Sequence, residues 1–569
     1  MKTFSFFLLF MTACVADPVE FSSTNNNSSE DVGNNSTQDV GNDTTSDIEC
    51  VPLVECGDGC GKINDGCGGA IECEPCACEN GLALETQCGA CGLGLLNCSE
   101  GKGVCEIDSD LVGLTCDDMV FYKASSIIAG AGTKEEPFST LPLALAEAKI
   151  SLKTIVAAEG EVDSLDSLQL ENGVNIIGGF DEEFVRNLGT KPKIEVKELV
   201  VVTDVFRPTK IKNIDIKALH TNDDTDLPAV GMFIDNSPKF ILDGCRIEVA
   251  DGLNGPDGSD VAAGADGGDG TSGSNEITLR RAACKIRSVS GGHGGSSSCG
   301  SGGGSGGRTA GSSATGVCWD TATPGFSGQN QGGAGGAVGS WSGNSWSSLP
   351  IAPADGVAGL AGIADITLNG AHGNGLAPTG FRGVIGSKGI IGRPGKGGGG
   401  GGGAVGVYAG DGRYYSGASG GGGGAGGCGG LGGQPGYGGQ SSIAIIVRDS
   451  EGVQILNSSL NPGKGGDGGK GSRGGAGGIG GLGADGGKSL AYGSSDANRD
   501  GGIGGNGGKG GAGGAGGDGS GGTSIGIVCI TMESIETAGT AVHLGVGGKT
   551  PSTNEVSEPM KTFLCPINN

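Results

Sequence analysis

Three short stretches carry residue types that could cleave a polysaccharide. Residues 221–226 read TNDDTD, residues 292–294 read Gly-His-Gly, and residues 285–287 read Lys-Ile-Arg. Inverting glycoside hydrolysis needs a carboxylic acid and a carboxylate on opposite sides of the scissile bond, so paired Asp residues beside a His would suit it. His293, however, also fills the third place of a glycine triplet, GGH, which explains it without chemistry. We therefore predict no catalytic residue.

The cysteines could support a second kind of chemistry. Twelve of the 20 lie between Cys50 and Cys116. An even, dense set after an export signal is typical of disulfides. The alternative is zinc, because residues 73–76 and 88–91 are both Cys-x2-Cys, but the 11-residue gap between them is short for a zinc ribbon and no His lies nearby. We predict disulfides over 48–118, with no metal and no cofactor, and one unpaired cysteine among the seven later ones.

The tryptophans are candidate ligand contacts. Trp319, Trp341 and Trp346 all lie in one insertion. Exposed, they could stack on sugar rings; buried, they would form a small satellite cluster. We name them as candidate carbohydrate contacts.

The N-terminus predicts export. Lys2 precedes an apolar run at residues 4–11, followed by Thr12-Ala13-Cys14, and this run is too short to span a bilayer. The segment MTAC resembles a bacterial lipobox. The resemblance implies that Cys14 is diacylated and anchors the protein to the outer membrane or cell surface. The alternative is ordinary secretory cleavage after Ala16.

Charge and composition limit the partners. Residues 15–49 hold eight acidic residues and no Lys or Arg, so we predict a disordered acidic tether over 15–47. The formal net charge of the whole chain is -27, which argues against nucleic acid as a partner. The partners that we expect are the membrane, through the lipid, and a polysaccharide or another cell surface.

Beyond Phe121 the sequence predicts a short helix followed by strands. Residues 132–150 offer Thr140 or Ser139 as N-cap and Pro142 in the first turn, with Leu141, Leu145 and Ala148 on one face. Strand-length aliphatic pieces follow at intervals of about ten to fifteen residues, separated by Gly, Asn or Asp.

This region resembles the N-terminal cap and first coils of right-handed parallel β-helix proteins of the pectin-lyase-like type. The matching residues are Gly132-Thr133, Pro137-Phe138, Thr140-Leu141, Ala144-Leu145, Asn172-Gly173-Val174 and Gly178-Gly179-Phe180-Asp181. The resemblance implies that the helix covers the unpaired strand edge of the first coil. It is silent on activity, because such folds host lyases, hydrolases, adhesins and inert shafts. Hydrolases of this fold carry Gly-His-Gly before Arg-Ile-Lys, whereas here the basic tripeptide comes first and is reversed.

Internal repeats support a solenoid independently. Residues 230–252, 442–465 and 524–547 each read as a small residue, an aliphatic strand, a polar turn, a second strand and Gly. Each is about one coil, and glycine tracts follow the first two. Residues 275–289 and 404–410 look like partial coils between them.

The glycine tracts hold a strict period of three. Residues 465–488 read GGDGGKGSRGGAGGIGGLGADGGK, and 380–397, 423–440 and 501–521 keep the same register. Collagen needs more Pro, and calcium-binding nonapeptides need a period of nine. Disorder remains an alternative, because ordering glycine costs much backbone entropy.

A period of three matches an extended left-handed helix with three residues per turn. One edge of such a helix at 465–488 would carry Asp467, Lys470, Arg473, Ala476, Ile479, Leu482, Asp485 and Lys488. This layout would let the aliphatic centre pack on a surface while the charged ends stay in water. Bundles of this kind resemble those of glycine-rich antifreeze proteins and phage tail-fibre adhesins.

These observations predict an all-β protein. Its parts are a lipoprotein signal peptide (1–14), the tether (15–47), a small disulfide-rich domain (48–118) and a capped right-handed parallel β-helix (119–569). Glycine-triplet (polyglycine II-like) helices leave the β-helix at about 251–275, 291–345, 370–440, 463–489 and 501–523. We expect a lipid-anchored structural or adhesive protein. The alternatives are a polysaccharide lyase or hydrolase and, more weakly, an ice-binding or surface-lattice-binding protein.

Overall fold

The computed structural model describes most of the chain beyond residue 86. The described residues are 62–64, 70–72, 87–99, 102–125, 130–219, 227–280, 289–309, 322–341, 350–363, 369–408, 413–490, 499–532 and 534–568. The predicted signal peptide with Cys14, the tether, residues 221–226 and 285–287, Trp319 and Trp346 lie outside them. The chain divides into two compact units, 1–161 with 174–192, and 162–173 with 193–569.

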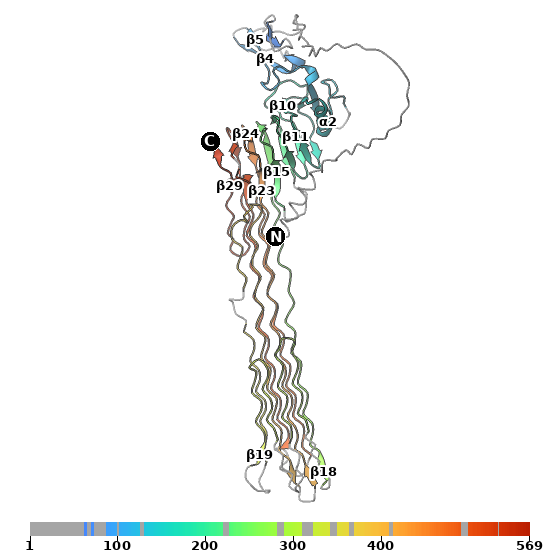
Figure 1. Cartoon of the computed structure of the whole chain (residues 1–569), viewed down its shortest axis with the longest axis vertical. Coiled ribbons are helices and arrows are strands. Elements are labelled where there is room, and N and C mark those ends of the chain that lie inside the picture. Colours follow the sequence, from blue (N-terminus) through green and yellow to red (C-terminus); the bar gives the residue numbers. More distant parts are fainter. Residues whose placement is uncertain are drawn as a thin grey trace, which may run out of the picture. The chain divides into compact units, whose positions relative to one another are not determined.

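The first unit combines short antiparallel hairpins with parallel strands and one helix (Figure 1). Its elements are β1 (Lys62–Asn64), β2 (Ala70–Glu72), β3 (Gln87–Cys88), η1 (Ala90–Gly92), β4 (Gly94–Ser99), β5 (Lys102–Glu106), η2 (Cys116–Asp118), β6 (Met119–Lys123), α2 (Leu141–Ser151), β7 (Thr154–Ala158) and β10 (Ile176–Phe180). Strands β6, β7 and β10 pair in parallel, with β7 in the middle.

Helix α2 confirms the predicted helix. Thr140 is the N-cap, and a proline stands in the first turn. Leu141, Ala144 and Ala148 have no exposed surface, because this face of the helix packs on β6 and β7. The helix therefore packs on the β6–β7 pair.

The cysteine-rich segment contains disulfides, as predicted. Cys91 pairs with Cys116, and Cys105 is also disulfide-bonded. A disulfide sulfur is not a thiolate, so Cys91 is not available to a zinc site. Leu93 and Leu111 pack in one core with residues of β6, β7 and β10.

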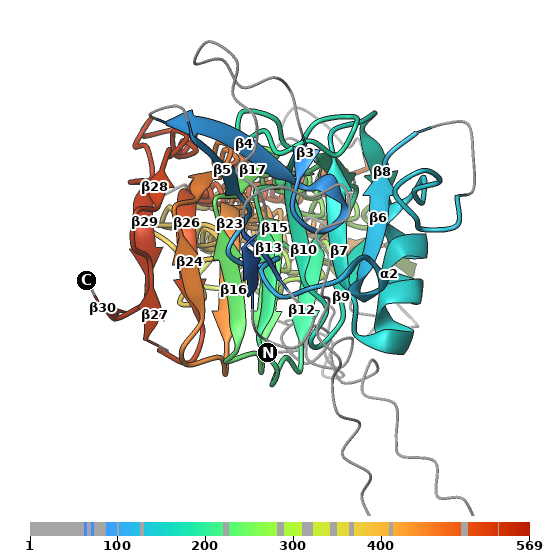
Figure 2. The ribbon, with the colours of Figure 1, turned by 90° about the horizontal axis from the view of Figure 1, so that it is seen from above.

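The second unit consists of three parallel sheets of short strands, which fit a β-helix-like fold (Figure 2). The first sheet has β9 (Leu168–Leu170), β12 (Val200–Thr203), β15 (Ala229–Asp235), β23 (Ser442–Arg448), β26 (Ser524–Cys529) and β29 (Met560–Phe563). The second has β13 (Thr209–Lys212), β16 (Phe240–Asp243), β24 (Gln454–Leu456), β27 (Ile535–Glu536) and β30 (Ile567–Asn568). The third has β8 (Asp163–Leu165), β11 (Lys193–Val196), β14 (Asp215–Ala218), β17 (Arg246–Val249), β25 (Ser459–Asn461) and β28 (Ala541–Val542).

Aliphatic side chains stack in columns at the centre of this unit. In the first sheet one column is Leu168, Val200, Met232, Ile445 and Ile527. Each of these residues is at most 2% exposed. Because every coil brings an equivalent side chain to the same column, burial depends on the neighbouring coils, as in other solenoids.

The three sequence repeats form equivalent coils. Each contributes one strand to each sheet in the same order, and the strands start in register at Ala229, Ser442 and Ser524. The first repeat therefore begins one residue earlier than the sequence alignment at Val230 places it.

The corner after each second-sheet strand needs a left-handed residue. Asn213, Gly244, Asn457 and Gly539 occupy this corner in successive coils, with φ between 48° and 70°. Asn and Gly are the residues that adopt this conformation most readily. The next residue, Cys245, is a buried thiol whose Sγ donates to the carbonyl of Ile211.

The prediction of partial coils between the repeats is wrong. The described parts of the two fragments predicted as partial coils, residues 275–280 and 404–408, do not form such coils. Instead, β18 (Thr278–Arg280), β22 (Arg413–Tyr415) and β21 (Val407–Tyr408) form a small antiparallel sheet that joins the ends of glycine tracts. Strands β19 (Ser340–Trp341) and β20 (Pro350–Ile351) form a second antiparallel pair. Both arise where the chain reverses direction, so local pairing replaces stacking.

Truncating a column residue should destabilise this unit. Ile445→Ala should lower the free energy of unfolding by about 2–5 kcal/mol, because it opens a cavity between β15 and β26. Urea denaturation followed by circular dichroism measures this change. Ile479→Ala is the matched control, because Ile479 is 66% exposed, and it should change stability by less than about 0.5 kcal/mol. Equal effects of the two substitutions would contradict the column.

Candidate functional site

Eight glycine-rich tracts run side by side in the second unit (Figure 1). They make up most of the residues of this unit that lie outside helices and strands. We number them by their described residues: tract 1 (251–276), tract 2 (289–309), tract 3 (322–339), tract 4 (350–363 and 369–375), tract 5 (380–404), tract 6 (416–440), tract 7 (463–489) and tract 8 (501–523). Tract 1 follows β17 and tract 7 follows β25, whereas tracts 6 and 8 lead into β23 and β26.

Tract 6 lies at the centre of the bundle and bonds to several neighbours in turn. The amide of Gly421 donates to Gly502 in tract 8, that of Gly422 to Thr271 in tract 1, and that of Gly423 to Gly304 in tract 2, at 2.8–3.0 Å. The next three residues repeat this order. Because successive amides point to different tracts, the backbone groups are satisfied between tracts, not within them.

The close approach of the tracts requires glycine. A Cβ on Gly424 would lie 2.0 Å from the carbonyl oxygen of Gly481, and one on Gly422 would lie 1.9 Å from that of His293. Contacts this short are absent from real structures, so the backbone would have to move. A residue that faces a neighbouring tract must therefore be glycine or a very small residue.

Larger side chains stand where no tract is adjacent. In tract 5, a Cβ on Gly400 would meet Ser305 of tract 2. Ile391 lies nine residues earlier in the same tract, and its side chain is 56% exposed. In tract 6, Gly422 faces tract 2, and nine residues later Leu431 is 43% exposed. Nine residues are three triplets, so each pair occupies the same edge of its tract. The switch occurs because tract 2 reverses direction near Gly300.

The register of the strands continues into the tracts. Asp235 pairs with Arg448 across β15 and β23, a separation of 213 residues. The same separation joins Asp251 to Lys464 at the start of tracts 1 and 7 and Asn275 to Lys488 near their far ends. The separation stays at 213 residues from the strands to the far ends of the tracts, so neither segment has an insertion relative to the other. Tracts 1 and 7 therefore continue the register of the stacked strands.

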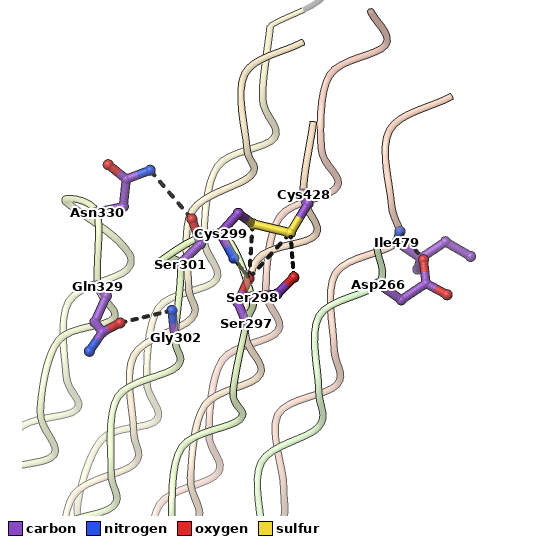
Figure 3. The surroundings of a disulfide bond; sticks show 10 residues. All are labelled: Asp266, Ser297, Ser298, Cys299, Ser301, Gly302, Gln329, Asn330, Cys428 and Ile479. Carbon is purple, nitrogen blue, oxygen red and sulfur yellow. Dashed lines mark hydrogen bonds between the residues drawn. A yellow bond between two sulfur atoms is a disulfide. The ribbon is translucent and has the colours of Figure 1, made fainter. Parts of the chain in front are cut away.

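A row of Asp and Asn side chains in tract 1 seals one edge of tract 7. These residues are Asp251, Asn254, Asp257, Asp266, Asp269 and Asn275. In each case a side-chain oxygen accepts the backbone N–H of an exposed tract 7 residue at 2.7–2.8 Å, as Asp266 does for Ile479 (Figure 3). Asp355 and Asn369 of tract 4 do the same for tract 8. This role was not predicted from the sequence, although the spacing of these residues in multiples of three indicates that they share one edge of tract 1.

The predicted stripe of tract 7 is observed on the surface. All eight stripe residues are exposed. Its aliphatic centre is not packed, however: Ile479 and Leu482 are 66% and 62% exposed, and no described part of the chain covers them. The reason is that glycine edges, not side-chain edges, make the contacts between tracts.

A disulfide fixes the tip of tract 2 to the central tract. Cys299 pairs with Cys428, 129 residues apart, and the tip is held further by Gln329 and Asn330 of tract 3, which bond Gly302 and Ser301 (Figure 3). A second disulfide, Cys529–Cys565, joins β26 to the segment after β29. With the buried thiol of Cys245, these pairs account for all five described cysteines after Cys116.

A buried ion pair closes the far end of tract 1. Arg499 Nη1 lies 2.6 Å from Glu276 Oε1, and the two side chains are 4% and 0% exposed. The guanidinium also stands over the ring of Tyr415. A buried ion pair of this kind favours a single arrangement of the two segments that carry it, because burying either charge without its partner would destabilise the fold.

Of the three predicted carbohydrate contacts, Trp341 is the one among the described residues. Trp341 belongs to β19, where its backbone pairs with Pro350, and the other two tryptophans lie outside the described residues. His293 is an exposed tract residue whose N–H donates to the Thr271 hydroxyl. The acidic and basic stretches that would accompany it in a hydrolase lie outside the described residues.

One charged group on consecutive strands has the residue types of a polysaccharide-cleaving site. On the outer face of the third sheet, Glu195, Lys217 and Glu248 are neighbours on β11, β14 and β17. Lys217 Nζ lies 2.9 Å from Glu195 Oε1, and this hydrogen bond raises the pKa of Lys217. A raised pKa keeps the lysine protonated, which is the opposite of what a general base needs.

Comparisons with protein-family models, curated proteins and solved structures gave no match. Within the described residues, no helix is long and apolar enough to cross a membrane. The same residues contain no group of three or more His, Cys, Asp or Glu that could hold a metal ion.

An inner glycine should not tolerate even one methyl group. Gly424→Ala should lower the free energy of unfolding by about 3 kcal/mol or more, because the new Cβ meets the backbone of tract 7. Urea denaturation measures the change. Gly189→Ala is the control, because its Cβ would meet only the side-chain oxygen of Asn187. A tolerated Gly424→Ala would show that tracts 6 and 7 are not in contact.

The stability of this region should fall in acid through Asp518. Burial alone would raise the pKa of Asp518, but hydrogen bonds from Ser552 and Gly471 and the nearby His372 lower it below its ordinary value. A carboxyl whose pKa is lowered by folding contributes stability above its unfolded pKa of about 3.9, and this contribution disappears as pH falls through the folded pKa. Thermal unfolding from pH 5 to pH 2 should show a steeper loss in the wild type than in Asp518→Asn. Parallel curves would contradict this role.

Proposed function

We propose that the chain is a lipid-anchored cell-surface protein with a structural and adhesive role. In this proposal a right-handed parallel β-helix carries the tracts as a bundle of polyglycine II-type helices. Cys14 supplies the anchor, residues 15–47 supply the tether, and the bundle is a stiff surface for contact with a polysaccharide or another cell.

The hydrogen bonding of tract 6 is the observation that carries the proposal. Three successive amides, Gly421 to Gly423, donate to three different tracts. A helix with three residues per turn directs successive backbone groups about 120° apart, which is the geometry that this pattern requires. A bundle joined in this way resists bending, because bending would stretch bonds between tracts along their whole length.

The distribution of side chains supports contact with a partner over catalysis. Glycine edges point inward, and the third residue of a triplet points to solvent, as Ile479, Leu482 and Leu360 do at 62–67% exposure. Such a bundle presents side chains in straight rows at fixed spacing. A repetitive surface of this kind suits repeated weak contacts, in which effective concentration raises the total affinity.

The enzyme alternative depends on the charged group around Lys217. It places carboxylates and a basic residue on consecutive strands, and a lyase or hydrolase would need such a set. Against it, Lys217 and Glu195 already neutralise each other. Release of reducing ends or unsaturated products from polygalacturonate, with and without calcium, would support the enzyme and count against a purely adhesive role.

The lipid anchor gives the direct test of the proposed role. In a Gram-negative host supplied with a fatty-acid analogue, the wild type should be labelled and sediment with membranes. Cys14→Ala should lose both properties, because the thiol that is acylated is removed. Ala16→Leu is the control: it blocks the alternative secretory cleavage and should leave labelling intact.

The same strains test adhesion. Cells that carry the wild type should retain more polysaccharide-coated beads than cells that express Cys14→Ala. Labelling that survives Cys14→Ala would contradict the anchor, and equal bead retention by the two strains would contradict the adhesive role.

A further inference from the structure

We propose that tracts 5 and 6 form a basic and apolar face that binds an acidic polysaccharide. This inference deepens the proposed adhesive function and rests on it. The face is defined by Lys388, Ile390, Ile391 and Arg393 of tract 5 and by Leu431 and Tyr437 of tract 6.

The charge of these tracts is opposite to that of the chain. The whole protein has a formal net charge of -27, yet residues 375–408 and 413–448 contain no Asp or Glu. Tract 5 carries Arg382, Lys388, Arg393 and Lys396. A local field of positive sign on a strongly acidic protein selects negatively charged partners and orients them on approach.

Three basic side chains of tract 5, those of Lys388, Arg393 and Lys396, are available to a partner. Some basic residues elsewhere are paired, as Lys217 is with Glu195 and Lys488 with Asp500. Within the described part of the chain, no carboxylate lies within ion-pair distance of Lys388, Arg393 or Lys396. Lys388 and Arg393 are also exposed. Their charges are therefore solvated and can exchange water for a carboxylate.

Apolar side chains lie beside these charges. Ile390 and Ile391 are each 56% exposed, and Leu431 and Tyr437 are 43% and 44% exposed. The amide of Gly392 donates to Gly430, so Ile391 and Leu431 stand at one level on adjacent tracts. The face thus offers C–H surface and one aromatic ring next to cations, and aromatic rings stack on the apolar faces of sugars.

The layout fits a linear polymer. Ile390, Arg393 and Lys396 form one row, and Lys388, Ile391 and Pro394 form another. At a rise of about 3.1 Å per residue, successive members of a row are about 9 Å apart. A chain of acidic sugars also alternates carboxylates with apolar ring faces along a straight axis, so it can meet both rows repeatedly.

Two other acidic partners fit less well. Insertion into a membrane surface needs a continuous apolar stripe with charges on the opposite side, whereas here each row contains both charged and aliphatic residues. Nucleic acid carries about one charge per 1.7 Å of duplex, which the few cations of this face match poorly within a chain of net charge -27. A uronic acid polymer presents fewer charges per unit length and more apolar surface.

The test is binding of the full chain to immobilised polygalacturonate, with neutral dextran, duplex DNA and anionic phospholipid vesicles as comparisons. The charge-reversal variant is Lys388→Glu with Arg393→Glu. The matched control is Lys470→Glu with Arg473→Glu in tract 7, where both side chains are also exposed but Asp257 and Asp260 lie on the adjacent tract. Circular dichroism checks that both variants fold.

We expect the wild type to bind polygalacturonate and to release it as salt rises, since exposed charges are screened. The tract 5 variant should lose affinity about tenfold or more, equivalent to at least 1.4 kcal/mol, while the control should change less than about twofold. Equal affinity of the tract 5 variant and the wild type, equal losses in both variants, or a preference for DNA, vesicles or dextran would overturn this proposal. Failure of the adhesive function is seen separately, in the bead retention of the Cys14→Ala strain.

Discussion

Every buried amide and carbonyl of the glycine tracts must be paired, and this constraint organises the second unit. Gly421, Gly422 and Gly423 each donate to a different neighbouring tract. The extended helix with three residues per turn that we propose for the tracts has no hydrogen bonds of its own, which explains this dependence. An isolated tract could not offset its loss of backbone entropy. The parallel sheets solve this problem, because they stack the starting points of successive tracts at the usual strand spacing of about 4.8 Å. The unbroken separation of 213 residues, from Asp235 and Arg448 to Asn275 and Lys488, is the evidence that strands set the register of tracts.

The same constraint divides the sequence of each tract into two classes of position. An edge that meets another backbone must be glycine or nearly so, as Gly424 is against Gly481. The residues on an edge that faces water are free to vary in type, and they supply nearly all the exposed side chains of the bundle. At the rim, where no further tract supplies a carbonyl, Asp and Asn side chains accept the remaining amides, as Asp266 does for Ile479. In the proposed adhesive role, binding specificity is therefore encoded in one or two rows per tract. Tracts with different rows, such as the acidic tract 1 and the basic tract 5, can coexist in one bundle.

Much of this frame could be predicted from the sequence, because local rules and repeats agree. The capping residues of α2, the three coil repeats and the period of three each follow from residue type and spacing. The arrangement of tracts could not be predicted, because it depends on which distant segments become neighbours. Sequence alone does not show that residues 278–280 pair with 413–415 in an antiparallel sheet, or that Ile479 remains exposed. The candidate site was harder to predict, because each Asp or Asn of the row in tract 1 accepts the amide of a residue 213 positions further along the chain, and no local pattern shows that pairing.

The proposed adhesive role needs a stiff, repetitive surface, and the bundle provides one only if its tracts are ordered. Native-state amide hydrogen exchange, resolved to single residues in tracts 1 and 6, tests that order most directly. In the central tract, amides from Gly421 to Cys428 should all exchange slowly, since each donates to another tract. In tract 1 between Gly255 and Gly267, slow exchange should occur only at Gly255, Gly258, Gly264 and Gly267, whose spacings are multiples of three. Fast exchange throughout both tracts, without this difference of pattern, would contradict the bundle.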